Sequence, residues 1–340
     1  MIFKIQSRFT TEELSQSPQL EQVFIRLNNI CNAKCEFCDV WQTSKEQFNK
    51  KIPVLDFVEQ LIEFPLTDVN LHGGESFLSK EFKQILLASK GRIPFSITTN
   101  GRCLTDENIE FIANNNVTRI YLSVDHFDET LNAKSRGIPW LEDNLHSAIR
   151  RIKTSHPQII LIINHVVSSY NIETIDKMCL TAKTLGADCI NLIPMKDYNK
   201  LFVSIDQIEI FYKKIESLLR EGLIKEGFFL GKFYKIFGNG LENWISSSKG
   251  EYNLASKRAC IIPSNTMFID AVSGDVYPCD TTMYRENHQQ YIMGNIIEDR
   301  IKDIWDGEKY RKFRGEMFPE IRHHCVKGCD PANCIKQELA

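Results

Sequence analysis

The stretch Cys31-Asn-Ala-Lys-Cys35-Glu-Phe37-Cys38 is the most informative part of this sequence. It holds three thiols with three and two residues between them, and no fourth cysteine lies nearby. Thiolates that converge in this way are typical ligands of an iron-sulfur cluster or of zinc. Because catalytic metal sites keep one coordination position free while structural zinc sites are closed, the pattern predicts a reactive centre with an open position.

Two other interpretations fit the spacing. Positions 31, 35 and 38 share one face of a helix, so three buried cysteines would give the same pattern. The residues around the thiols are polar, however, and they follow the apolar run 23–27, which favours a loop after a strand. Structural zinc is the second alternative, and the spacing leaves it open.

With an aromatic residue directly before the last cysteine, this stretch resembles the signature of radical S-adenosylmethionine (SAM) enzymes. The resemblance implies that Cys31, Cys35 and Cys38 hold a [4Fe-4S] cluster and that Phe37 belongs to the cofactor site. SAM would chelate the remaining iron through its amino and carboxylate groups. It would then be cleaved by one electron to give a 5'-deoxyadenosyl radical that abstracts hydrogen from the substrate.

Composition limits the class of protein. The chain has 340 residues, of which 43% are hydrophobic and 25% charged, with a net charge of −3. This suits an ordinary globular chain with room for one large domain and a smaller one, and it makes nucleic acid an unexpected partner. The longest apolar run, residues 159–163, is too short to span a membrane, so we expect a cytoplasmic protein. In that reducing compartment the eleven cysteines indicate metal rather than disulfides.

Short apolar runs alternate with amphipathic segments along the first two thirds of the chain. The pattern predicts strands at residues 22–28, 68–72, 94–99, 118–124, 159–166 and 188–193, with helices between them and a further helix at 204–221. Strands that alternate with helices form a parallel sheet with right-handed crossovers. We therefore predict an α/β protein built on a partial (β/α)6 TIM-like barrel.

Polar residues follow the predicted strands. They include the cysteine loop, His72-Gly73-Gly74-Glu75, Thr98-Thr99-Asn100-Gly101 and Ser123-Val124-Asp125, together with Asn164 near the end of strand five and Pro194 at the end of strand six. In a parallel βα architecture the loops at the carboxyl ends of the strands converge. The sequence therefore predicts one site at that end of the barrel.

Several of these residues resemble SAM contacts of the family. Gly73, Gly74 and Glu75 resemble the motif that receives the SAM ammonium group, and glycines there let the backbone approach closely. Asn100, Ser123 and Asp125 match positions that contact the ribose and the methionine carboxylate, and Arg136 resembles an arginine that pairs with that carboxylate. The alternatives are a simple turn at Gly73-Gly74, helix caps for the other three, and a solvated surface arginine.

A second set of cysteines lies near the end of the chain. Cys260 and Cys279 flank a predicted hairpin, with a strand at 266–269 and a turn at 273–275, and Cys325, Cys329 and Cys334 follow. This set resembles the SPASM or twitch extension, a small cysteine-rich domain that carries auxiliary [4Fe-4S] clusters. We expect one such cluster on Cys260, Cys279 and two of the last three, with zinc as the alternative. Cys103, Cys179 and Cys189 are expected to be core thiols.

These features predict a radical SAM core over residues 1–225, an aromatic connector at 226–254 and a SPASM/twitch-like domain at 255–340. The expected activity is that of an oxidoreductase-type enzyme that modifies a peptide or protein. The alternatives are an enzyme that acts on a sugar, aminoglycoside or other small polar metabolite, and a non-catalytic iron-sulfur or zinc module. Expected partners are an electron donor of the flavodoxin or ferredoxin type and, since only about 20 residues precede the first strand, a separate peptide-recognition protein.

Overall fold

The computed structural model describes residues 18–43, 45–137, 142–195, 203–229, 262–284 and 287–315. These residues contain one nine-stranded sheet with the order β6-β5-β4-β3-β2-β1-β7-β8-β9. The strands are β1 (Gln22–Arg26), β2 (Asp68–His72), β3 (Phe95–Thr99), β4 (Val117–Ser123), β5 (Ile160–Val167), β6 (Cys189–Pro194), β7 (Thr266–Asp270), β8 (Asp275–Tyr277) and β9 (Gly294–Asn295). All pairs from β6 to β7 are parallel, whereas β8 and β9 pair antiparallel.

Helices connect the parallel strands and follow the last hairpin. They are α2 (Val54–Ile62), α3 (Glu81–Ser89), α4 (Asp106–Asn114), α5 (Glu129–Arg136), α6 (Glu142–Ser155), α7 (Ile175–Leu185), α8 (Ile205–Arg220), α11 (Ile262–Asn265), α12 (Asp280–Met283), α13 (Ile301–Trp305) and α14 (Glu308–Gly315). Short 3-10 helices lie at Val40–Gln42, Ser76–Leu78, Ile172–Thr174, Glu226–Phe228 and His288–Tyr291. None of the described helices is long and apolar enough to cross a membrane.

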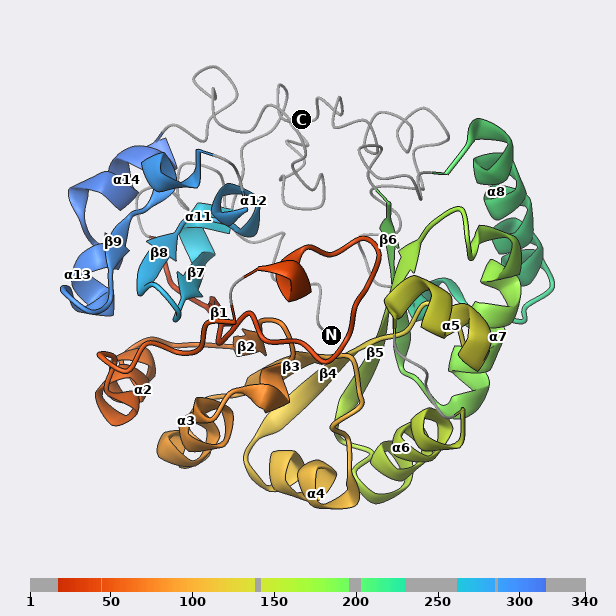
Figure 1. Ribbon diagram of the computed structural model, residues 1–340, viewed down its shortest axis with the longest axis horizontal. Helices are drawn as coiled ribbons and strands as arrows, with labels where there is room; N and C mark the ends of the chain where they lie inside the picture. The colour runs from red at the N-terminus through yellow and green to blue at the C-terminus, as the bar shows by residue number, and fades with distance from the viewer. Residues whose placement is uncertain are drawn as a thin grey trace, which may run out of the picture.

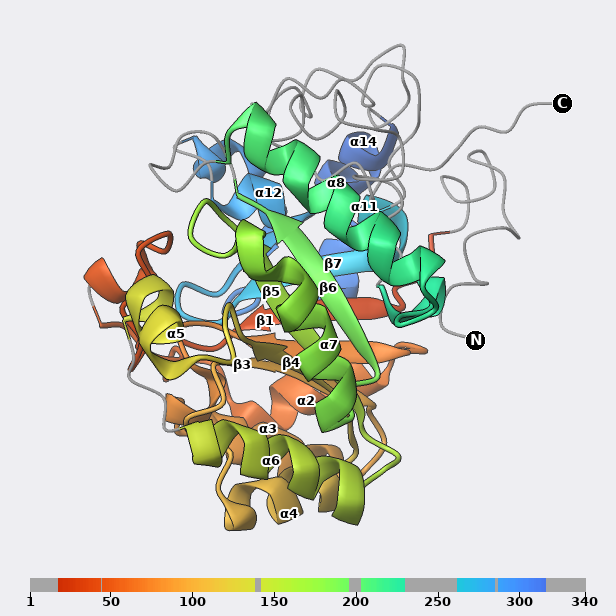
Figure 2. The same ribbon diagram turned by 90° about the vertical axis from the view of Figure 1, so that its right-hand side faces the viewer.

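The strands curve around a common interior, and α2, α3, α4, α6 and α7 form an arc outside them (Figure 1). A second view shows α7 and α8 beside β5 and β6 (Figure 2). The predicted α/β class and the six predicted parallel strands are confirmed, with small shifts at the strand ends. Asn164 lies within β5 rather than near its end, because this strand continues to Val167.

The two faces of the sheet differ in polarity, and this difference is why the strands could be recognised in the sequence. Fully buried aliphatic side chains face the helices, among them Val23, Ile25, Val69, Leu71, Ile97, Ile120, Leu122, Leu161, Ile163 and Ile190. The alternate positions carry polar residues that hydrogen-bond to one another: Asn70 Nδ2 donates to Ser96 Oγ at 2.9 Å, and Ser96 Oγ donates to Asp68 Oδ2 at 2.8 Å. The interior-facing positions of β2 and β3 are therefore polar, whereas Phe24 of β1 and Phe268 of β7 are apolar residues on the same face.

Local capping signals set the helix boundaries. Thr105 caps α4, since its hydroxyl accepts from Asn108 N, and Asp128 caps α5 by accepting from Leu131 N. Ser204 and Gln207 form a capping box at the start of α8. Helix α5 ends at Arg136 and is capped by Gly137, whose φ of 62° is a left-handed conformation that favours glycine.

The C-terminal hairpin belongs to the same sheet as the barrel. Strand β7 pairs in parallel with β1, so that Arg26 lies opposite Asp270 and Phe24 stacks on Phe268 with ring centroids 4.7 Å apart. The predicted hairpin is confirmed. Of the predicted aromatic connector only residues 226–229 are described, and both aromatic residues among them, Phe228 and Phe229, are buried. The predicted boundary at 254–255 lies outside the described residues.

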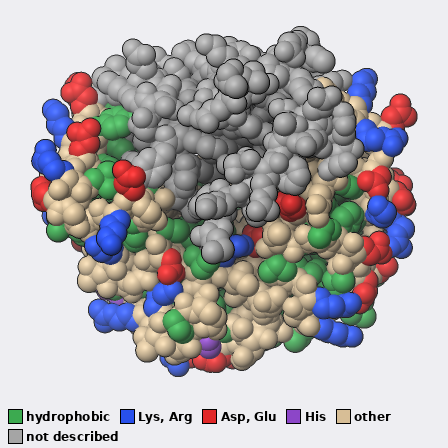
Figure 3. Space-filling model, turned by 180° about the vertical axis from the view of Figure 1, so that it is seen from behind, with side chains coloured by type: hydrophobic (Ala, Val, Ile, Leu, Met, Phe, Trp, Pro, Cys, Tyr) green, Lys and Arg blue, Asp and Glu red, His purple; other side chains and the backbone are tan. Residues whose placement is uncertain are grey.

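Charges are mixed over the surface. On the described part of the face in Figure 3, Lys and Arg are interspersed with Asp and Glu. This agrees with the small net charge of −3 and shows no broad single-sign patch on that part of the face.

The ion pair between β1 and β7 leads to a stability prediction. Arg26 Nε donates to Asp270 Oδ1 at 2.9 Å, and a second contact joins the same two side chains. Asp270→Asn should leave the half-buried guanidinium without its counter-charge and destabilise the protein by about 2 kcal/mol. Anaerobic thermal unfolding of the cluster-loaded protein should then show a melting temperature several degrees lower.

A matched control is Lys302→Ala, which removes an ion pair between two exposed side chains on one helical face. It should change the melting temperature little. If Asp270→Asn and Lys302→Ala lowered the melting temperature equally, the Arg26–Asp270 pair would not contribute to the link between β7 and the barrel.

Candidate functional site

The three cysteines of the predicted cluster lie in an irregular loop that follows β1. Cys35 is buried, Cys31 and Cys38 are half-buried, and none is in a disulfide. The loop prediction is confirmed and the alternative of a helical face is wrong, because no helix covers residues 31–38. Trp41 Nε1 donates to Cys35 O at 3.0 Å and fixes the far end of the loop.

The turn after β2 holds one side of this loop. Gly74 N donates to Asn28 O at 2.9 Å, and Glu75 N donates to Ile30 O at 2.8 Å. A Cβ atom on Gly74 would lie 2.2 Å from Ile30 O, and one on Gly73 would lie 2.5 Å from Asn28 O. Both glycines are therefore required for close backbone packing against the cysteine loop, beyond forming a turn.

The end of α5 holds the other side, and α5 lies beside the loop in Figure 1. Lys34 N donates to Arg136 O at 3.0 Å, and Glu36 N donates to Ser135 O at 3.1 Å. A Cβ on Gly137 would lie 2.5 Å from Lys34 O. The cysteine loop thus lies between two elements about 60 residues apart in sequence, and backbone hydrogen bonds fix it to both.

Glu75 and Asn100 connect the ends of β2 and β3 to the loop. The buried Glu75 carboxylate accepts from Thr99 Oγ1 and from Asn100 N, both at 2.8 Å. Asn100 Nδ2 donates to Asn32 Oδ1 at 2.7 Å and lies 3.9 Å from Cys31 Sγ. Asn100 does not cap α4, so the capping alternative is wrong for this residue.

Burial raises the pKa of Glu75, and its hydrogen bonds to Asn100, Thr99 and Phe77 oppose that rise. Its carboxylate oxygens accept these bonds from protein groups, so it stabilises the loops around the cysteines. A contact of this carboxylate with the SAM ammonium stays a prediction.

Asp125 and Arg136 form a buried ion pair next to the cysteines. Arg136 Nη2 donates to Asp125 Oδ1 at 3.0 Å, and the same oxygen accepts from Val166 N at 3.1 Å. The guanidinium carbon lies 5.5 Å from the ring centroid of Phe37. Arg136 is only 6% exposed, so the alternative of a solvated surface arginine is wrong.

Two atoms of this pair have unused hydrogen-bonding capacity. Arg136 Nε and Asp125 Oδ2 are buried and have no hydrogen-bond partner among the described residues. Buried polar groups normally find a partner, so these atoms suit contact with a polar ligand. Ser123, half-buried, ends β4 on the same sheet edge, and neither it nor Asp125 caps α5, which uses Asp128.

The thiols lie close enough to influence one another. Burial raises the pKa of Cys35 to about 11; the Arg136 charge opposes this rise, and the neighbouring Asp125, Cys38 and Cys31 add to it. Burial also raises the pKa values of Cys31 and Cys38. Thiolates in such a place need a metal centre to stabilise their charge, which fits an iron-sulfur cluster.

Only one cysteine of the second set lies within the described residues. Cys279 follows β8, is half-buried and lies 3.6 Å from Thr282 Oγ1. Cys260, Cys325, Cys329 and Cys334 lie outside the described residues. Of the three expected core thiols Cys179 is buried, whereas Cys103 and Cys189 are half-buried.

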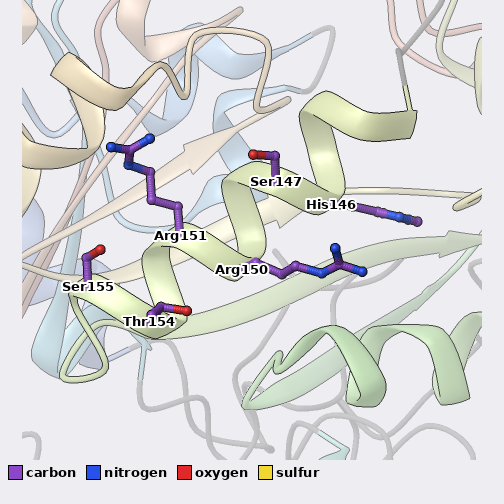
Figure 4. Close-up of a pocket in the computed structure, with 6 residues that line it drawn as sticks. All are labelled: His146, Ser147, Arg150, Arg151, Thr154 and Ser155. Atoms are coloured by element: carbon purple, nitrogen blue, oxygen red, sulfur yellow. The ribbon is translucent and has the colours of Figure 1, made fainter.

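A pocket elsewhere on the molecule does not belong to this site. It is lined by residues of α6 alone, His146, Ser147, Arg150, Arg151, Thr154 and Ser155, on the outer helix layer (Figure 4). Arg151 pairs with Asp106 of α4, which identifies the surroundings as a helix-helix surface. It contains none of the predicted site residues.

Sequence reasoning missed the neighbours of Arg26. Arg26 and Asp270 face each other across β1 and β7, and His72 lies opposite Arg26 on β2. Burial lowers the pKa of His72 to about 4, and the Arg26 charge adds to this effect, so the imidazole is neutral near pH 7. The sequence did contain a signal, because Arg26 is a charged residue inside the apolar run 23–27.

Comparisons with known proteins agree with this geometry. A family model described as the radical SAM superfamily matches residues 25–182, and the SPASM model, described as an iron-sulfur cluster-binding domain, matches residues 260–334. The chain belongs to the radical SAM superfamily. It is therefore an enzyme of that superfamily, with [4Fe-4S] clusters and SAM as its cofactors.

Three relatives illustrate the similarity. A tungsten-containing aldehyde ferredoxin oxidoreductase cofactor-modifying protein from Pyrococcus furiosus is 23% identical over 87% of this chain and 83% of its own length. A serine-type anaerobic sulfatase-maturating enzyme from Bacteroides thetaiotaomicron is 24% identical over 88% and 78%. Streptococcus suis SuiB bound to its precursor peptide SuiA superimposes with a TM-score of 0.66, at 18% identity, over 87% of this chain and 67% of SuiB.

The contact between Gly74 and the cysteine loop gives a testable prediction. Gly74→Ala should push Ile30 and the cysteines away, because its Cβ would overlap a backbone oxygen. We expect the anaerobically reconstituted variant to lose about four irons per chain, one cluster, and to stop cleaving SAM. Iron and sulfide analysis and chromatography of 5'-deoxyadenosine measure both effects.

Gly227→Ala is the matched control, since a Cβ there meets nothing within 4 Å. It should keep full iron content. Normal iron in the Gly74 variant would show that the close packing against Ile30 is not needed to hold the cluster.

Proposed function

We propose that this radical SAM enzyme modifies a peptide or protein. The observation that carries the site assignment is the loop with three free thiols at the carboxyl end of the barrel, fixed between the turn after β2 and the end of α5. We assign Cys31, Cys35 and Cys38 as ligands of the SAM-binding [4Fe-4S] cluster. Their number leaves one iron for the cofactor.

The surrounding residues would bind SAM. The backbone at Gly73, Gly74 and Glu75 would receive the ammonium group, and Asn100 and Ser123 would contact the ribose and the carboxylate. Arg136 has a buried Nε without a partner among the described residues, which suits a ligand carboxylate. When bound, the cluster and SAM supply a 5'-deoxyadenosyl radical that abstracts a hydrogen atom.

Several residues of the chain would hold the cysteine loop in a fixed position during this chemistry. Phe37 lies against the Arg136 guanidinium beside the thiols, and Trp41 donates to Cys35 O, so both hold the loop in place. Asn100 fixes the loop at Cys31 through its bond to Asn32. A fixed loop keeps the proposed cluster and cofactor in one orientation.

The second cysteine set would hold an auxiliary [4Fe-4S] cluster. We assign Cys260, Cys279 and two of Cys325, Cys329 and Cys334 as its ligands. Because β7 lies next to β1, Cys279 comes from the hairpin that is added directly to the barrel sheet. Such a cluster would accept the electron left on the substrate radical, which would make the net reaction an oxidation and the enzyme an oxidoreductase.

Two of the relatives support a polypeptide substrate. One is named for the maturation of a sulfatase, and the SuiB structure contains a precursor peptide. The polar side chains Asn70, Ser96 and Asp68 on the interior face of β2 and β3 support a small polar metabolite as the second candidate. An electron donor of the flavodoxin or ferredoxin type, a separate peptide-recognition protein and a cytoplasmic location complete the proposal.

Cysteine variants test the two metal assignments separately. Replacing Cys31, Cys35 and Cys38 together by Ala should abolish dithionite-dependent formation of 5'-deoxyadenosine, because no cluster remains to deliver the electron. Cys279→Ala should leave this cleavage in place and lose the modified product. The parent should contain about eight irons per chain. Deoxyadenosine from the triple variant, or stoichiometric zinc in the parent, would contradict the assignment.

The substrate class has its own test. Short peptides encoded beside the gene should be incubated anaerobically with the reconstituted enzyme, SAM and dithionite, and their masses measured. We expect one peptide to lose two hydrogens and to increase deoxyadenosine formation. A scrambled peptide of the same composition is the control. Turnover of a sugar or aminoglycoside instead, with all peptides unchanged, would favour the second candidate.

A further inference from the structure

A positive charge lies directly against the cysteine loop. Arg136 ends α5, is only 6% exposed, and stacks on Phe37, the residue before Cys38. Its backbone oxygen accepts from Lys34 N, the residue before Cys35. Burial alone would lower the pKa of Arg136, but the charges of Asp125 and Cys35 raise it, so the guanidinium stays charged. The cation is therefore fixed beside two of the proposed cluster ligands.

The opposite charge comes from the end of the neighbouring strand. Asp125 is 1% exposed and is held by Val166 N of β5 as well as by Arg136. Only one of the two Asp125 carboxylate oxygens takes part in the ion pair, because Oδ2 has no partner among the described residues. The pair has no net charge. The Arg136 charge acts on Cys35 more strongly than the Asp125 charge does, and the guanidinium lies over Phe37, so the positive end of the pair is the one nearer the cysteines.

Charges in this position act on the electron that a cluster gains. Reduction adds one negative charge, so a nearby cation favours the reduced form and a nearby anion disfavours it. Burial keeps the interaction from being screened by solvent ions. Charge and burial are among the factors that set the potential of iron-sulfur clusters.

We propose that the Arg136–Asp125 pair sets the reduction potential of the cluster held by Cys31, Cys35 and Cys38. Arg136 is a positioning residue that favours the reduced cluster, and Asp125 cancels part of its effect. This role is separate from SAM binding, and it does not depend on which substrate the enzyme modifies. It rests on the proposed cysteine assignment.

Substitutions of Asp125 and Arg136 should shift the midpoint potential in opposite directions, which structural damage alone would not do. Asp125→Asn keeps the size of the side chain and leaves the guanidinium charged, so it should raise the midpoint potential. At a fixed potential the ratio of reduced to oxidised cluster should rise about tenfold, which equals about 59 mV for a one-electron couple. Arg136→Gln should lower the potential, and Arg136→Lys should remain near the parent.

The measurement is a redox titration of the reconstituted protein without SAM, followed by electron paramagnetic resonance. The signal that changes when SAM is added afterwards identifies the cluster, and its loss in the triple cysteine variant checks the assignment independently. The auxiliary cluster serves as an internal reference. Arg92→Gln, which removes an exposed cation paired with Glu59, is the matched surface control and should shift neither potential.

Iron content decides whether each variant is informative. The backbone hydrogen bond from Lys34 N to Arg136 O does not involve the replaced side chain, so we expect the variants to keep their clusters. If Arg136→Gln loses iron, Asp125→Asn and Arg136→Lys still decide the question. An unchanged or lowered potential in Asp125→Asn, or shifts of the same sign in the Asn and Gln variants, would overturn the proposal.

Discussion

Two backbone hydrogen bonds, from Gly74 N to Asn28 O and from Glu75 N to Ile30 O, fix the cysteine loop on the barrel. They form only because the strands before them, β1 and β2, are parallel neighbours whose ends meet at the same edge of the sheet. The close approach also requires that residues 73 and 74 have no side chains. The geometry of the cysteine loop thus follows from strand pairing and from two positions without a Cβ atom.

Much of the fold was predictable because the parallel strands are buried on their helix-facing side. Runs such as Val69-Asn70-Leu71 alternate apolar and polar residues, and each apolar position proved to be fully buried. The site was predictable for a related reason, since residues that directly follow parallel strands must converge. The glycine pair with Glu75 marked Gly74 in the sequence, and polar side chains marked Asn100 and Asp125.

What the sequence could not supply were contacts between distant segments. Arg26 and Asp270 are 244 positions apart, and no local sequence pattern predicts that β7 pairs with β1. Asn100 and Asp125 are caps by residue type, yet Thr105 and Asp128 cap the helices instead. Residue type alone does not decide between a local hydrogen bond and a tertiary one.

The pairing of charges within the barrel bears on how the interior would select its substrate. Three arginines, two from strands and one from the end of α5, each lie against a carboxylate: Arg26 with Asp270, Arg119 with Asp68, and Arg136 with Asp125. Burial raises the pKa of Asp68 to about 6, even though Ser96 and Arg119 oppose this shift. Each of these three pairs is balanced locally, so together they add no net charge to the interior. Discrimination between substrates would then depend on hydrogen-bond geometry and shape rather than on net charge.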